Sequence, residues 1–194
     1  MYSVVLRTQG RLEEARAESE QARQLDPTSL AINHTLAFNF VATREYGRAI
    51  EQMKKTLELD PSFQLPRIVL ALVYAVQGRH GEAVAELKKL GPASELPASY
   101  AGSVGGIYGM AGRRAEALRI LAELEERSKL EYVPASARAL IYIGLRDKDR
   151  AFAWLDKAYA ERDWRLRELK VSPRFDSLRS DPRFTRLLKQ MHLQ

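Results

Sequence analysis

The stretch His34–Pro61, HTLAFNFVATREYGRAIEQMKKTLELDP, contains two helical patterns separated by a short polar break. In the first pattern Leu36, Ala37 and Phe40 recur at helical spacing, and the break follows at Thr43–Glu45. The apolar residues of the second pattern are Tyr46, Ala49, Ile50, Met53 and Leu57. The closing Asp-Pro pair stops this second helix, because proline lacks the amide hydrogen and disfavours helix in the residue before it. The stretch therefore predicts a helix–turn–helix unit.

The same pattern returns at intervals of 34 residues along the chain. One column of equivalent positions holds only alanine: Ala15, Ala49, Ala83, Ala117 and Ala151. A second column is aromatic or leucine: Leu6, Phe40, Tyr74, Tyr108 and Tyr142. A third is small (Ser3, Ala37, Ala71, Gly105, Ala139), and a fourth is mostly apolar (Ser19, Met53, Leu87, Leu121, Leu155). A fixed period in this range is typical of one supersecondary unit that is copied and stacked, so the sequence predicts a helical solenoid.

These columns resemble the tetratricopeptide repeat, whose unit is a helix–turn–helix with a small residue and an aromatic on the first helix, alanine on the second and a closing proline. The resemblance covers residues 1–161. It implies an all-α, right-handed superhelical solenoid of about five units, the first of them truncated. The closing proline is missing after the third and fourth units, where the longer links Gly91–Pro97 and Ser128–Pro134 occur. We interpret these links as adjustments of superhelix pitch.

Residues 162–194 form a basic C-terminal cap in this interpretation. The last 34 residues contain nine Lys or Arg and five Asp or Glu, within a chain of net charge +6. Asp181 is a suitable N-cap and Pro182 suits the first helical position. The apolar face of the helix that follows is Phe184, Leu187, Leu188 and Met191. The sequence therefore predicts a helix that closes the core of the last repeat.

The ends of the chain predict a larger context. Residues 150–194 are similar to the C-terminal part of bacterial multidomain proteins in which repeats of this type follow an output module, such as a winged-helix domain, a kinase or a nucleotide cyclase. Extending the repeat period backwards places the start of the first helix before Met1. We therefore expect the chain to be the C-terminal part of a longer polypeptide with an attached upstream domain. No output-module motif occurs in the chain itself.

Composition and motifs argue against catalysis. The chain has no cysteine, and none of its apolar runs is long enough to span a bilayer, so we expect a cytoplasmic protein without disulfides. The histidines His34, His80 and His192 are scattered and have no second ligand at metal-binding spacing. The glycines of residues 102–112 fall inside an expected helix, whereas a phosphate loop lies between a strand and a helix. We expect no enzyme activity, no cofactor and no metal.

The family resemblance implies a concave groove lined by the first helix of each unit. The lining assigned in this way is His34, Phe38, Val41, Ile68, Leu72, Gly102, Gly106, Gly109, Leu140 and Ile143. It lacks the lysine, asparagine and arginine with which chaperone-binding members hold a peptide carboxylate. We predict that an apolar or amphipathic helical segment docks there, with the glycines allowing close approach of its backbone. The alternative is that residues 162–180 of the chain itself fold back into the groove.

Three functions remain open at this point. The first is a non-catalytic scaffold that binds a protein or peptide partner. The second is a regulatory module of a longer bacterial signalling or transcription-regulator protein. The third is nucleic-acid binding by the basic residues Arg162, Arg165, Arg167, Lys170, Arg174, Arg179, Arg183 and Arg186, which lack the interleaved aromatics of single-strand binders. Exposed repeat ends would also allow two copies of the chain to pair.

Overall fold

The computed structural model describes residues 2–193, and within them the chain forms α-helices and short 3₁₀-helices but no strand. The repeat helices are α1 (Tyr2–Thr8), α2 (Leu12–Leu25), α3 (Leu30–Ala42), α4 (Tyr46–Leu59), α5 (Leu65–Val76), α6 (His80–Lys88), α7 (Ala98–Met110), α8 (Arg114–Arg127), α9 (Ala135–Gly144) and α10 (Lys148–Ala160). The remaining elements are η1 (Ala93–Glu95), η2 (Trp164–Glu168), η3 (Pro173–Leu178) and α11 (Pro182–Gln190). The all-α prediction is confirmed.

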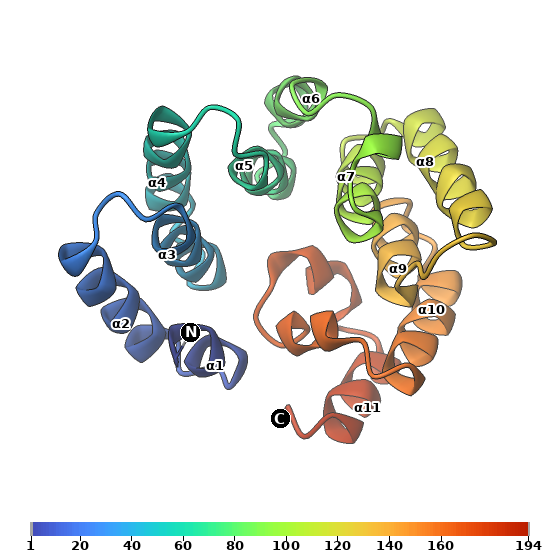
Figure 1. The fold of residues 1–194 in the computed structure, drawn as a ribbon. Helices are drawn as coiled ribbons and strands as arrows, with labels where there is room; N and C mark the ends of the chain where they lie inside the picture. Colours follow the sequence, from blue (N-terminus) through green and yellow to red (C-terminus); the bar gives the residue numbers. More distant parts are fainter. Residues whose placement is uncertain (1, 194) are drawn as a thin grey trace.

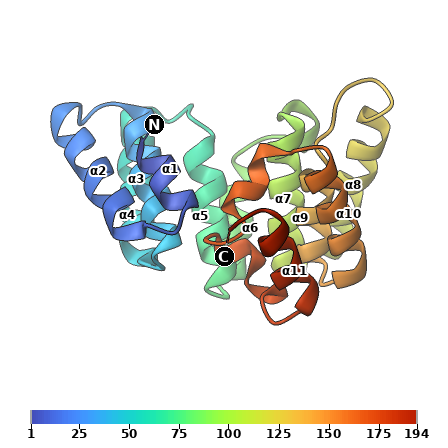
Figure 2. The same cartoon turned by 90° about the horizontal axis from the view of Figure 1, so that it is seen from below.

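The helices are arranged as a curved solenoid of helix pairs. The odd-numbered repeat helices α1 to α9 form the inner layer and the even-numbered ones the outer layer (Figure 1). The C-terminal segment, drawn in orange and red, returns to the centre of this curve. Seen from below, the repeats form a curved wall (Figure 2). The C-terminal segment packs against α5, α9 and α10. The chain is therefore superhelical, as the repeat period predicts.

The columns of the sequence are the packing positions of the solenoid. All five residues of the alanine column have no exposed surface. The small-residue column is also buried at every position, from Ser3 in α1 to Ala139 in α9. Helices approach closely at these positions, and a larger side chain would force them apart at a cost of about 1–3 kcal/mol. The 34-residue period therefore marks the positions at which neighbouring helices are in close contact.

The turn within each repeat contains a further periodic position that the sequence analysis did not use. Its members have positive φ angles between 61° and 84°: Gly10, Arg44, Gly78, Gly112 and Arg146. Glycine adopts this left-handed conformation without steric cost, whereas arginine does so against a small penalty. The conformation reverses the chain between the two helices of each repeat.

The glycines of α7 correct the sequence-based prediction. We expected Gly102, Gly106 and Gly109 to present bare backbone to a partner, but they face α9. A methyl group on Gly106 would lie 2.6 Å from the carbonyl oxygen of Leu140, and one on Gly102 would lie 2.5 Å from the Cα atom of Ala137. A methyl group on Gly144 of α9 would lie 2.0 Å from the carbonyl oxygen of Gly106. These glycines therefore allow the backbones of α7 and α9, in neighbouring repeats, to approach each other closely.

This packing predicts that alanine at Gly106 or Gly144 destabilises the protein. Each substitution should lower the free energy of unfolding by about 1–3 kcal/mol, because α7 and α9 must separate to admit the methyl group. Urea denaturation followed by circular dichroism measures the effect. The matched control is Gly47→Ala in α4, where a methyl group would meet no atom within 4 Å. The control should gain up to about 1 kcal/mol from helix propensity. Equal stability of Gly106→Ala and wild type would contradict the close contact.

The C-terminal segment completes the hydrophobic core. Leu166, Leu169, Phe175 and Leu178 are all at most 4% exposed and belong to the same apolar cluster as the repeats. The predicted capping helix is α11, and its N-cap Asp181 accepts a hydrogen bond from the backbone nitrogen of Arg183 at 3.0 Å. On its apolar face Phe184 and Leu187 are buried, and Leu188 and Met191 pack against the core. The cap and the repeats thus share one core.

Candidate binding site on the concave face

Residues 162–180 lie across the concave face of the solenoid. The guanidinium of Arg44, in the turn after α3, donates to the carbonyl oxygen of Val171 at 3.1 Å and to the carboxylate of Asp176 at 2.8 Å. Farther along the segment, Arg174 donates to the hydroxyl of Ser103 on α7 at 3.4 Å. Of the two occupants considered for the groove, the structure therefore contains the chain's own segment.

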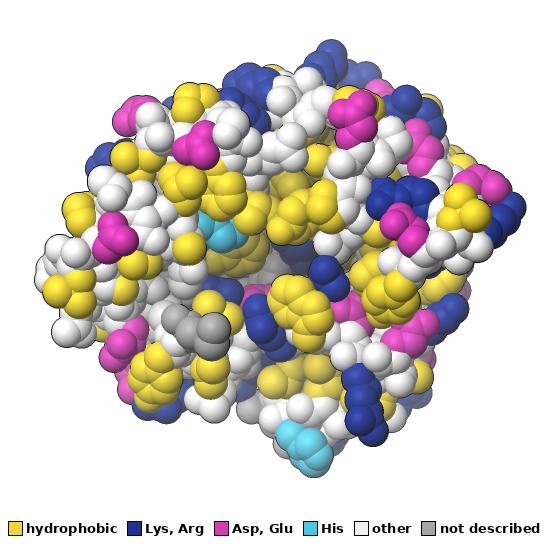
Figure 3. All heavy atoms as spheres, viewed as in Figure 1, with side chains coloured by type: hydrophobic (Ala, Val, Ile, Leu, Met, Phe, Trp, Pro, Cys, Tyr) yellow, Lys and Arg dark blue, Asp and Glu magenta, His cyan; other side chains and the backbone are white. Residues whose placement is uncertain are grey.

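A cavity remains between this segment and the inner helices. Its volume is about 320 Å³, and its walls come from α1, α3, α5, α7, α9, α10 and residues 164–175. Figure 3 shows a hollow at the centre of this face, bordered by hydrophobic, basic and histidine side chains. The cavity has the size of a small-molecule site, since such sites span about 300–1,000 Å³.

The predicted groove residues separate into three groups. Those that line the cavity are His34, Phe38, Ile68 and Leu140. Leu72 and Ile143 are buried and line only a much smaller hollow of about 10 Å³ beside Arg174. Val41 is 1% exposed and belongs to the core, while the three glycines pack on α9. Four of the ten predicted groove residues therefore line the cavity.

Four arginines line the cavity, Arg7, Arg165, Arg167 and Arg174, together with the carboxylate of Glu168. Arg165, Arg167 and Arg174 were predicted as nucleic-acid contacts, whereas Arg7 was not predicted as a site residue. Arg7 nevertheless carried a detectable signal in the sequence. It occupies a column whose other members are Val41, Ala75, Gly109 and Ile143, so it is the one charged residue at a position that is otherwise apolar or small.

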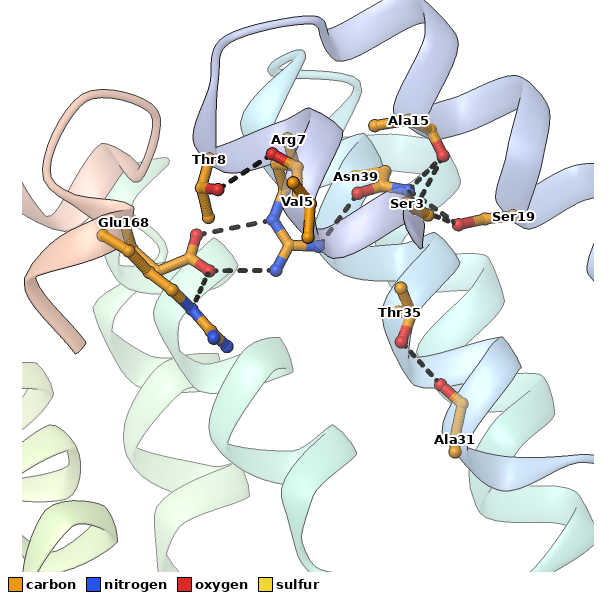
Figure 4. Close-up of polar contacts among 11 residues, drawn as sticks. Ser3, Val5, Arg7, Thr8, Ala15, Ser19, Ala31, Thr35, Asn39 and Glu168 are labelled. Carbon is orange, nitrogen blue, oxygen red and sulfur yellow. Dashed lines mark hydrogen bonds and ion pairs between the residues drawn. The ribbon is translucent and has the colours of Figure 1, made fainter. Parts of the chain in front are cut away.

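A buried polar network explains the irregular residues of the first repeat. Ser3 and Ser19 are the only serines in their columns, and their hydroxyl oxygens lie 2.6 Å apart. The side-chain amide of Asn39 donates to both hydroxyls, at 2.9 and 2.8 Å, and to the carbonyl oxygen of Ala15 at 2.8 Å (Figure 4). Buried polar groups are stable only when they are paired in this way. The polar residues Ser3, Ser19 and Asn39 therefore satisfy one another's hydrogen-bonding groups.

Arg7 extends this network to the C-terminal segment. Its guanidinium donates to the side-chain oxygen of Asn39 at 2.9 Å and to the carboxylate of Glu168 at 2.9 Å (Figure 4). The side chains of Arg7 and Glu168 are only 5% and 17% exposed, so water screens this ion pair weakly. The first repeat is thereby tied to a residue 161 positions later in the chain.

We predict that Glu168→Gln destabilises the protein by about 1–3 kcal/mol, because a buried guanidinium loses its counter-charge. Thermal and urea unfolding of both proteins measure the change. The control is Glu126→Gln, whose carboxylate pairs with Lys129 at 2.7 Å while both side chains are more than two-thirds exposed. That surface pair should contribute almost nothing. A similar small effect of both substitutions would show that Arg7 does not depend on Glu168.

His34 is a neutral ring in the cavity wall. Its ring centroid lies 5.3 Å from that of Phe38 and 6.0 Å from that of Phe63. Burial disfavours the charged imidazolium, and the nearby charge of Arg7 adds repulsion, so the pKa of His34 falls from 6.5 to about 4. Its Nδ1 atom is buried and has no hydrogen-bond partner among residues 2–193.

This depressed pKa predicts a stability that depends on pH. Between pH 6.5 and about 4 the unfolded chain binds a proton at His34 that the folded protein does not. The contribution is therefore complete above pH 6.5 and is lost as the pH falls, by about 1.4 kcal/mol per pH unit. His34→Phe should flatten the dependence in this window, as measured by urea unfolding at several pH values. An NMR titration of His34 with a midpoint near 6.5 would contradict the burial argument.

The basic residues of the C-terminal segment do not form a free cationic stripe. Arg183 bonds to Asp149 at 2.8 Å and to Asp181 at 2.9 Å, and Arg179 contacts Asp176 at 2.6 Å. Arg186 lies 3.8 Å from Asp156. A nucleic-acid surface needs cations available for phosphate contacts, and this pairing reduces that availability. Nucleic-acid binding by this segment is therefore poorly supported.

Neither a metal site nor a membrane-spanning helix is found in the described part of the chain. Among residues 2–193 no group of three His, Cys, Asp or Glu side chains is arranged to hold a metal ion. No helix in the same part of the chain is both long and apolar enough to cross a membrane.

A family model matches two parts of the chain. The family model described as tetratricopeptide repeat matches residues 1–25 and 64–89, which contain α1 with α2 and α5 with α6. No curated protein sequence matches the chain.

Solved structures match over almost the whole chain. A thermophilic TPR protein of Thermus thermophilus is 24% identical, with a TM-score of 0.63, and the match covers 97% of this chain and 96% of that one. A tetratricopeptide repeat protein of Parabacteroides merdae is 14% identical, with a TM-score of 0.53 and coverages of 98% and 76%. A chain of the APC/C hetero-tetramer Cut9–Hcn1 is 15% identical, with a TM-score of 0.59, but only 38% of that chain is covered. The likeness to these structures establishes the fold, and the tetratricopeptide repeat model matches two segments of it.

Proposed function

We propose that this protein is a non-catalytic scaffold that binds a protein or peptide partner across the mouth of the concave cavity. Repeats of this family generally mediate protein–protein contacts, and the fold supplies the concave surface that such contacts use. The observation that carries the proposal is an exposed aromatic residue at the mouth. Trp164 lines the cavity and is nevertheless 57% exposed.

The surroundings of Trp164 have the composition of an interaction hot spot. The guanidinium groups of Arg165 and Arg167 lie 4.6 and 4.3 Å from the centre of its ring system. Tryptophan and arginine are enriched among the residues that dominate binding energy, because they combine large apolar area with directed hydrogen bonds. Tyr100 and Leu65 line the same cavity. A partner that covers this mouth would bury Trp164 between two charged side chains.

The bound C-terminal segment restricts how a partner can dock. Residues 162–180 occupy the groove in which we predicted a helix of the partner, and their apolar side chains other than Trp164 are buried there. In this state the partner's contacts are with the mouth and with the outer side of the segment. A helix in the groove itself would require displacement of the segment, with loss of its contacts to Arg44 and Arg7.

The regulatory role in a longer signalling or transcription-regulator protein stays a prediction. The contact that favours it is the ion pair between Arg7 of α1 and Glu168 of η2. Displacement of the C-terminal segment would break this pair, so the first repeat would respond to events at the concave face. We infer that α1 is the element through which an attached domain would sense a partner.

The scaffold proposal predicts that Trp164→Ala weakens binding without unfolding the protein. Peptides selected from a random displayed library on the full chain serve as ligands, and their affinities are measured by calorimetry. We expect a loss of about tenfold or more, as for the removal of a central aromatic anchor.

The control is Tyr132→Ala. Tyr132 is also an exposed aromatic residue, at 67%, but it lies in the link between α8 and α9 and not in the cavity wall. Its replacement should leave the affinities unchanged. Equal affinities for wild type and Trp164→Ala would overturn the proposed surface, and a library without enriched peptides would overturn peptide binding at this face.

A further inference from the structure

The wall of the cavity contains polar atoms that lack partners. The hydroxyl oxygens of Ser136 and Ser172 and the Nδ1 atom of His34 are buried, and none has a hydrogen-bond partner among the described residues. Ser136 and Ser172 are only 5% and 4% exposed, and both line the cavity. Buried polar groups in folded proteins are nearly always paired. Water molecules can pair with these hydroxyl groups, so the hydroxyl groups alone do not identify a ligand. The charged side chains of the cavity indicate the chemistry of the ligand.

Arg174 is the charged group of the cavity that lacks a counter-ion. Its one hydrogen bond in the described structure is the long contact of 3.4 Å with the hydroxyl of Ser103. No carboxylate among residues 2–193 lies within ion-pair distance, and Glu168 acts on it only through space. Arg174 is half-buried, and this burial lowers the pKa of its guanidinium. A partly desolvated cation without a counter-ion favours an anion as its partner.

The other basic residues of the cavity are already engaged. Arg7 bonds to Glu168 and Asn39, while Arg167 lies 3.8 Å from Glu168. Arg165 lies 3.6 Å from Asp163, whose carboxylate also faces the backbone nitrogen of Ser136 at 3.4 Å. The negative charges therefore lie on the α1 side and at the start of α9. An anion would be placed beside Arg174, where Ser103 and Ser172 line the wall.

The remaining wall is apolar. Phe38, Ile68, Leu140, Leu166 and Phe175 line the cavity from the inner helices and the C-terminal segment. This surface can hold a hydrocarbon or aromatic body, whereas a compact hydrated anion would leave it unused. Arg174 therefore favours an anionic group, and the apolar wall favours a hydrophobic body in the same ligand.

We propose that the cavity binds a small carboxylate with an apolar body, whose carboxylate pairs with Arg174 and whose body packs on Phe38, Ile68 and Leu140. Ser172, whose hydroxyl has no partner among the described residues, would donate a hydrogen bond to a carboxylate oxygen. Because residues 164–175 form one wall, the ligand would also hold the C-terminal segment against the repeats. This inference goes beyond the scaffold function, which needs no small ligand.

Calorimetric titration of the full chain with octanoate tests the proposal. The comparison ligands are octan-1-ol and octylammonium, which share the apolar body and differ in charge. We expect saturable binding of one octanoate per chain, binding of octanol weaker by about tenfold or more, and no binding of octylammonium. These three titrations need no variant, so the proposal can fail even if every substitution at Arg174 unfolds the protein.

Arg174→Gln tests the assigned partner of the carboxylate. The variant should bind octanoate about tenfold or more weakly, while its affinity for octanol stays within about twofold of wild type. Retained octanol binding shows that the cavity is intact. The control is Arg119→Gln on the outer helix α8, where the side chain is 67% exposed, and this variant should bind octanoate as wild type does.

Three results would overturn the inference. They are no octanoate binding by wild type, equal affinity of wild type for octanoate and octanol, and unchanged octanoate affinity of a folded Arg174→Gln variant. None of these results bears on the selected peptides or on Trp164, because the titrations contain no partner. The scaffold proposal and the ligand proposal can therefore fail separately.

Discussion

Close contact between helices at small residues holds this solenoid together. The five alanines of the second helices have no exposed surface, and α7 meets α9 at glycines where a methyl group would overlap backbone atoms. Each unit buries its apolar face only against the next unit, so the spacing of these contacts sets the curvature of the whole solenoid. That curvature brings the inner helices around a common centre and creates the concave face (Figure 1).

The concave face is partly covered by residues 162–180 of the chain itself. Four leucine and phenylalanine side chains of residues 162–180 fill the groove, and Arg7 and Arg44 hold the segment by charge and backbone contacts. This arrangement joins the two ends of a fold in which contacts are otherwise between neighbours. It also divides the groove into a covered part and a residual cavity that is apolar, basic and incompletely paired.

Four polar exceptions to the repeat pattern belong to a single buried network. Ser3, Ser19, Asn39 and Arg7 each interrupt an otherwise apolar or small column, and the structure joins all four in one network that ends at Glu168. A buried polar residue requires partners, so several exceptions at one repeat interface indicate that they satisfy one another. Their shared location could have been inferred from the register, but the carboxylate 161 residues away could not.

The helical units, their register, the buried columns and the capping helix could be predicted from the sequence, because period and local capping chemistry act over at most one repeat length. Four of the predicted groove residues, His34, Phe38, Ile68 and Leu140, line the cavity. The packing of Gly102, Gly106 and Gly109 on α9 and the position of residues 162–180 in the groove became visible only in the folded chain. Both depend on the accumulated curvature of five units, which sums small rotations at every interface and leaves no local pattern in the sequence.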